Sequence, residues 1–123
     1  MSAEDGPVPA PADAAAGGTR LVFVTGPDPE TATRLVRTLV EEGVAACGNI
    51  LPGIRSVYRW QGRVEEEAEA LVLFKTTAAG AERLVHRIPE LHPYDVPEVL
   101  VVDVEAGYAP YLQWVAENVS PQP

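Results

Sequence analysis

Four side chains that can bind an ion or transfer a proton fall within one seven-residue stretch: His92, Tyr94, Asp95 and Glu98. An imidazole and two carboxylates can each supply a ligand to a metal, and closed metal sites usually take three or four ligands. Pro93 and Pro97 fix φ and push the residues before them towards extended backbone, which excludes a helix here. Polar groups on such a stiff connection are typical of a binding site. The alternative is a rigid corner whose polar groups only cap neighbouring backbone.

Two further residues carry chemistry outside this stretch. Cys47 is the single cysteine and lies in an apolar run, where its default role is a small buried side chain; as a thiolate it is a candidate soft-metal ligand. Lys75 is the only lysine, and an ammonium at the end of an apolar strand must pair with a carboxylate or orient a ligand. The sequence has no nucleophile–base pair and no glycine-rich phosphate loop, so it predicts a binding protein and not an enzyme.

Charge and composition exclude several classes of partner. The chain has 18 acidic and 9 basic side chains, and its net charge of −9 argues against binding to nucleic acid or to anionic membranes. No apolar run approaches the ~18 residues that span a bilayer. The N-terminus has neither a basic start nor an apolar h-region, and one cysteine excludes an internal disulfide. These features predict a cytoplasmic protein with one domain.

Apolar periodicity and turn residues predict the elements that position the polar stretch. In chain order we expect a strand at 21–24, a helix from Asp28 to Gly43, a strand at 44–51, a hairpin with arms 54–60 and 63–75, a helix from Thr77 that Pro89 ends or kinks, a strand at 99–104 and a last helix ending near Val119. This order is the split βαβ arrangement, an α+β ferredoxin-like sandwich with helices on one face of an antiparallel sheet and an extra C-terminal helix.

The ends of the chain differ from its middle in composition. Residues 1–18 hold three prolines, three glycines and six alanines, too little apolar material to offset the entropy of ordering, so they are predicted to form a disordered tail. Residues 19–119 form the predicted domain, and 120–123 form a second short disordered tail. The hairpin is long for a small domain and carries Trp60 near its Gln61-Gly62 turn. We therefore expect it to pack against another subunit.

Six segments match a known family in the correct order: Thr25-Gly26-Pro27-Asp28, Ala45-Ala46-Cys47-Gly48-Asn49-Ile50, Pro52-Gly53-Ile54, Tyr58-Arg59-Trp60-Gln61-Gly62, Leu73-Phe74-Lys75-Thr76 and Leu91-His92-Pro93-Tyr94-Asp95-Val96-Pro97-Glu98. Over about residues 20–119 the chain resembles the CutA divalent-cation tolerance proteins. The resemblance implies a ferredoxin-like subunit, a homotrimer formed through the long hairpins, a cytoplasmic location and a role in tolerance of copper and other divalent ions. It also implies clefts between subunits, lined here by Trp60, Lys75, His92, Tyr94 and Glu98.

Two departures from the family bear on metal binding. Val24 and Leu91 stand where relatives described as copper binders carry a cysteine and a second histidine. The prediction is therefore that no cofactor is required and that copper or another divalent cation binds weakly, with His92 as the metal ligand and Cys47 as a soft-metal candidate. The alternative is a trimeric small-molecule sensor or scaffold, similar to the PII signalling proteins, with no direct metal role. That protein would use the cleft of Lys75, Tyr94 and Glu98.

Overall fold

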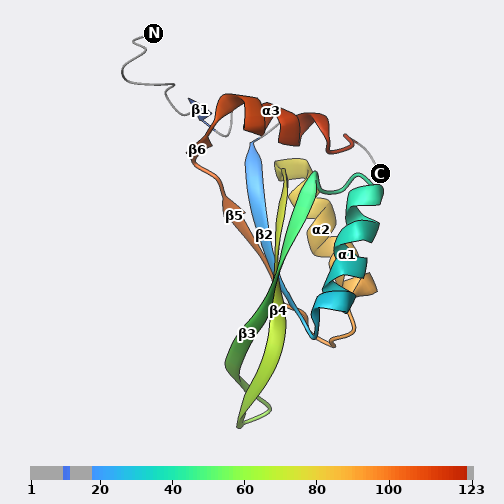
Figure 1. Cartoon of the computed structure of the whole chain (residues 1–123), viewed down its shortest axis with the longest axis vertical. Coiled ribbons are helices and arrows are strands. Elements are labelled where there is room, and N and C mark those ends of the chain that lie inside the picture. The colour runs from blue at the N-terminus through green and yellow to red at the C-terminus, as the bar shows by residue number, and fades with distance from the viewer. Residues whose placement is uncertain (1–9, 12–17, 122–123) are drawn as a thin grey trace.

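A four-stranded sheet forms the centre of the computed structural model, which describes residues 10–11 and 18–121 (Figure 1). Its strands are β2 (Thr19–Gly26), β3 (Cys47–Trp60), β4 (Arg63–Thr77) and β5 (Val99–Asp103). They lie in the order β3-β4-β2-β5, and every neighbouring pair is antiparallel. The α+β class and the antiparallel sheet predicted from the sequence are confirmed.

Three helices accompany the sheet: α1 (Pro29–Glu41), α2 (Ala78–Leu91) and α3 (Ala109–Glu117). The first two cover one face, and the third crosses the end of the sheet (Figure 1). The opposite face of the sheet, called here the open face, has no helix along it (Figure 1). None of the described helices is long and apolar enough to cross a bilayer.

The helices begin at the residues that the sequence predicted. The Asp28 carboxylate accepts a hydrogen bond from the Thr31 N–H at 2.7 Å, and the Thr77 hydroxyl accepts one from the Gly80 N–H at 3.1 Å. Each bond satisfies an amide that the first turn leaves without an intrahelical partner. After α1 the chain turns at Gly43, whose φ of +75° favours glycine.

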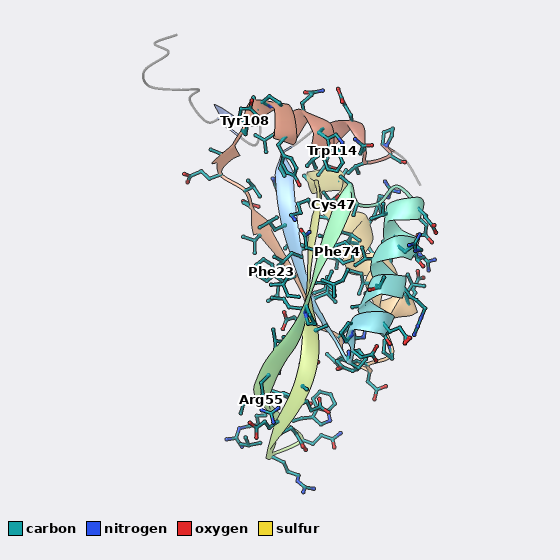
Figure 2. The ribbon with its side chains drawn as sticks, in the orientation of Figure 1. Phe23, Cys47, Arg55, Phe74, Tyr108 and Trp114 are labelled. Carbon is teal, nitrogen blue, oxygen red and sulfur yellow. The ribbon has the colours of Figure 1, made fainter. Side chains whose placement is uncertain are left out.

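Alternation along the strands divides the sheet into two faces. On the helix side, Val22, Val24, Val72 and Phe74 are each 0% exposed and pack with buried residues of α1 and α2. Phe74 points towards the helices and Phe23 points away from them (Figure 2). Successive side chains of a strand face opposite sides of the sheet, so this division follows from sequence parity.

Strands β3 and β4 continue past the rest of the sheet as a projecting hairpin (Figure 1). Its turn is the predicted Gln61-Gly62 pair, with φ of 51° and 79°, as a two-residue hairpin turn requires. The prediction that Pro52-Gly53 separates two strands is wrong. β3 runs through both residues, and the pairing register shifts there between Leu51 and Ile54, because an extra-residue bulge can absorb a proline within a strand.

The structure adds two details to the helices. Helix α2 continues beyond Pro89 to Leu91, so Pro89 does not end it, because a proline in the last turn removes only one backbone hydrogen bond. In α3, Tyr111 and Trp114 are 43% and 41% exposed. Leu112, Val115 and Val119 are the buried side chains at this end of the domain.

The structure describes part of each predicted tail. Ala10–Pro11 forms β1 and pairs antiparallel with β6 (Ala106–Gly107). At the other end, the backbone of Ser120 donates to the Gly43 carbonyl at 2.8 Å and accepts from the Arg83 guanidinium at 2.6 Å, so the domain includes Ser120. Residues 1–9, 12–17 and 122–123 lie outside the described residues, and the predicted tails stay a prediction there.

Gly48 allows α1 to pack closely against the sheet. A Cβ built on Gly48 would stand 2.8 Å from Val36 Cγ1 and 3.3 Å from Phe74 Cδ1. We expect Gly48→Ala to lower the free energy of unfolding by about 1–3 kcal/mol, because α1 must move away from the sheet. Denaturant titration measures this loss, and the neighbouring exposed Asn49→Ala is the control, expected within about 0.5 kcal/mol of the parent. An unchanged Gly48→Ala would show that α1 is not packed this closely.

Candidate functional site

A cleft of about 610 Å³ lies between the base of the hairpin and the connection from α2 to β5. Four carboxylates and three aromatic side chains are among the residues that line it: Glu67, Glu69, Asp95, Glu98, Tyr58, Trp60 and Tyr94. No lysine, arginine or histidine of the described residues lines the cleft. Its charge is therefore negative, and it favours cations over anions.

His92 fixes the start of the connection that forms one wall of the cleft. Its backbone N–H donates to the Ile88 carbonyl at 2.9 Å and ends α2. Its ring is buried, with Nε2 2.7 Å from the Thr25 carbonyl and Nδ1 3.1 Å from the Tyr94 N–H. Each ring nitrogen of the predicted metal ligand therefore has a hydrogen-bond partner within the chain.

Tyr94 links this connection to β4. Its hydroxyl donates to the Glu69 carboxylate at 2.6 Å, and the Glu69 side chain is only 7% exposed. Burial raises the pKa of the Tyr94 phenol, and the hydrogen bond to Glu69 raises it further. The phenol therefore keeps its proton and remains the donor at neutral pH.

A second tyrosine–carboxylate pair stands beside the first. The Tyr58 hydroxyl donates to Glu67 at 2.5 Å, and this hydrogen bond raises the pKa of Tyr58 to about 12. Both Tyr58 and Glu67 are exposed, so the pair borders the mouth of the cleft. Two carboxylates on alternate residues of β4 are thus held by phenols on the same side of the sheet.

Three of the five residues expected to line clefts between subunits also lie together in this cleft of a single chain: Trp60, Tyr94 and Glu98. The clefts between subunits stay a prediction. Lys75 does not line the cleft of the single chain: it pairs with Leu21 and lies six residues along β4 from the buried carboxylate Glu69, about 20 Å at strand spacing. Its distance from the cleft follows from the length of β4.

Glu69, Glu67 and Tyr58 were not among the predicted cleft residues. The hairpin that carries them was expected only to pack against another subunit. A usable signal was present, because Glu69 lies between two alanines where the apolar half of the strand begins. Register then places Glu67 opposite Ser56 and Glu69 opposite Ile54, on the side where Tyr94 approaches.

Cys47 was expected to face the core, and this was wrong. It pairs with Lys75 in register and lies on the open face, half-buried, near α3 (Figure 2). Its Sγ is 3.7 Å from the Tyr111 hydroxyl. Burial raises the pKa of Tyr111 to about 12, with a smaller contribution from the neighbouring thiol.

The described residues of one chain do not form a closed metal site. Over residues 10–11 and 18–121, no three His, Cys, Asp or Glu side chains converge closely enough to hold a metal ion. The carboxylates of the cleft are spread around its wall. An ion bound there would complete its coordination with water or with groups from a second chain.

Comparisons with known proteins agree on one family. The sequence pattern of the family described as "CutA1 divalent ion tolerance protein" matches residues 20–118. The chain is 46% identical over 98 residues to "Divalent-cation tolerance protein CutA" from Thermus thermophilus, covering 80% of this chain and 95% of that protein.

Solved structures of proteins with the same family name superpose on this chain. The structure called "Divalent cation tolerance protein (Cut A1)" from Thermus thermophilus superposes with a TM-score of 0.80 at 44% identity, covering 83% of this chain and 99% of that one. A structure from Archaeoglobus fulgidus, called "Periplasmic divalent cation tolerance protein CutA", also gives 0.80, at 29% identity, with 83% and 99% covered.

Proposed function

The chain belongs to the CutA1 divalent ion tolerance protein family, and from this premise we propose that it acts in tolerance of divalent cations by binding such an ion weakly in the carboxylate cleft. The protein is proposed to be a binding protein and not an enzyme, and to work in the cytoplasm without a required cofactor. Copper is the first candidate ion, because Cu²⁺ binds a given set of nitrogen and oxygen ligands more tightly than the other divalent first-row metals do.

The buried carboxylate of Glu69 carries this proposal. Among the described residues it forms no ion pair, and its hydrogen-bond partner is the neutral phenol of Tyr94. A buried carboxylate without a countercharge is costly, so a cation that enters the cleft would relieve the cost. Glu67, Asp95 and Glu98 stand around the same cleft and add to the attraction.

We propose that the protein is a homotrimer with the ferredoxin-like topology, which the strand order β3-β4-β2-β5 supports. The open face and the hairpin both expose apolar side chains: Leu100 is 57% exposed, and Val57 and Val64 are each 64% exposed. Such surfaces are typical of contacts between subunits. A hairpin lying across the open face of the next subunit would bring the cleft towards that subunit's copy of Lys75.

The test of cation binding is calorimetric titration of Glu69→Gln with Cu(II) and Zn(II). We expect the affinity to fall about tenfold or more, since the variant removes the buried charge and keeps the shape of the side chain; tenfold corresponds to about 1.4 kcal/mol. Glu66→Gln is the matched control, because Glu66 precedes Glu67 on β4 but pairs with Arg55 outside the cleft. Equal affinities for parent and Glu69→Gln would contradict the proposal. If only Cys47→Ala lost affinity for the metal, the thiol would be the binding site.

One observation favours the alternative of a small-molecule sensor. Tyr58, Trp60 and Tyr94 line a cleft whose volume lies in the range of small-molecule sites. With Lys75 supplied by a neighbouring subunit, the cleft could hold an aromatic or anionic molecule. Titration with small anions beside the metals distinguishes the two functions: heat from an anion, abolished in Lys75→Met but not in Glu69→Gln, would support the sensor.

A further inference from the structure

We infer that His92 is a positioning residue, whose ring holds Tyr94, and through Tyr94 the Glu69 carboxylate, in the wall of the cleft. The effect of His92 on cation affinity rests on the function proposed for Glu69. The protonation of its two ring nitrogens does not depend on that function. The inference differs from the prediction that His92 is itself the metal ligand. It starts from the two hydrogen bonds of one buried ring.

The partners of the ring define its protonation. The Thr25 carbonyl can only accept a hydrogen bond, so Nε2, at 2.7 Å, must carry a proton. The Tyr94 N–H can only donate, so Nδ1, at 3.1 Å, must offer its lone pair. His92 is therefore neutral and protonated on Nε2. A metal ligand needs a free lone pair, and the single lone pair of this tautomer already accepts the Tyr94 amide.

The ring lies where three elements meet. His92 ends α2, and its Nε2 donates a hydrogen bond to the Thr25 carbonyl on β2. Tyr94, which follows His92 in the chain, reaches Glu69 on β4. The imidazole also packs against the Tyr94 ring, with centroids 4.6 Å apart and planes at 59°. The Tyr94 phenol then donates to Glu69 at 2.6 Å.

This geometry gives His92 an effect on the ion without contact with it. Without the ring, Tyr94 loses both its amide partner and its packing neighbour, and its hydroxyl is no longer held against Glu69. The loss of one neutral hydrogen bond is modest. We therefore expect a weakening of cation binding of about threefold to tenfold, not its abolition.

Side-chain replacements separate positioning from ligation. In His92→Asn the amide oxygen takes the place of Nδ1 as acceptor for the Tyr94 N–H, whereas His92→Ala offers no acceptor. In calorimetric titrations with Zn(II) we expect His92→Ala to lose the stated factor and His92→Asn to recover most of it. Equal and near-complete loss in both variants would overturn the inference, because an amide cannot replace an imidazole ligand.

The link through Tyr94 has its own test. Tyr94→Phe keeps the aromatic ring and removes the hydroxyl that holds Glu69. If His92 acts through Tyr94, the double variant His92→Ala/Tyr94→Phe should bind Zn(II) about as weakly as either single variant. Multiplied losses would show that His92 and Tyr94 act separately, and would overturn the inference.

Nitrogen NMR tests the ring without relying on binding affinity. The chain has two histidines, and His86 is an exposed residue of α2. In the variant His86→Asn, the only remaining histidine signals are therefore those of His92. We expect Nε2 to be protonated and Nδ1 unprotonated, with both signals unmoved by saturating Zn(II). A protonated Nδ1 in the free protein, or a Zn(II)-induced shift typical of a ligated nitrogen, would overturn the inference. If Zn(II) binds without dependence on Glu69, the proposed function fails while this tautomer test remains decisive.

Discussion

Replacing Phe74 with alanine is expected to lower the free energy of unfolding by about 3–5 kcal/mol. Phe74 is 0% exposed and points from the middle of the sheet towards α1 and α2 (Figure 2). Its register partners are Gly48 on β3 and Val22 on β2. Because Gly48 has no side chain, its own position contributes no atoms that could fill the space left by the ring.

Phe74→Leu is the matched control. It keeps most of the apolar volume, and we expect a loss of less than about 1.5 kcal/mol. Both variants are unfolded with denaturant at one fixed protein concentration, because the stability of an oligomer depends on concentration. An alanine variant as stable as the leucine variant would contradict the description of this core.

Leu100→Glu is expected to convert the proposed trimer into monomers. Leu100 is 57% exposed on edge strand β5, opposite Phe23 in register, so it lies on the open face of the sheet. If the hairpin of a neighbouring subunit covers this face, the new carboxylate would be buried in each interface without a partner. The trimer would bury three unpaired carboxylates, and each costs several kcal/mol. This total exceeds the free energy that subunit contacts of ordinary size contribute to association.

Sedimentation velocity at micromolar concentration measures the change. Val85→Glu introduces the same charge at a 40% exposed aliphatic position of α2, away from the open face, and should leave the trimer intact. If the parent protein sediments as a monomer, the proposals of a trimer and of a cleft between subunits are both contradicted. A trimeric Leu100→Glu would place the interface elsewhere on the molecule.

Local features of the fold were predictable because their causes lie within a few residues of one another. The Asp28 and Thr77 caps bond to amides three residues ahead, and Gln61-Gly62 makes its own turn. Strand parity separates Phe74 from its neighbours Leu73 and Lys75 without knowledge of any partner. The error at Pro52-Gly53 arose because a proline's effect depends on whether its backbone neighbours have other partners, which local sequence does not reveal.

The residues of the candidate site come from distant parts of the chain. Trp60, Tyr94 and Glu98, which were expected in clefts between subunits, line one cleft of the single chain. Glu69 was missed because its burial depends on Tyr94, 25 residues later in the chain, which reaches it only after α2 has returned the backbone to the sheet. Lys75 lies towards the other end of β4, so its predicted place in a cleft between subunits stays a prediction.

Patterns in the sequence are enough to predict where α1 and α2 begin, where the hairpin turns, which residues of one strand share a face and which family the motifs resemble. These properties follow from backbone hydrogen bonding, φ preferences and side-chain parity, all of which act over short stretches of chain. The tertiary structure buries Glu69 and places Cys47 on the open face. It also places both nitrogens of His92 in hydrogen bonds to Thr25 and Tyr94. Burial and hydrogen-bond partners depend on segments that meet after folding, and no local pattern specifies which atoms will meet.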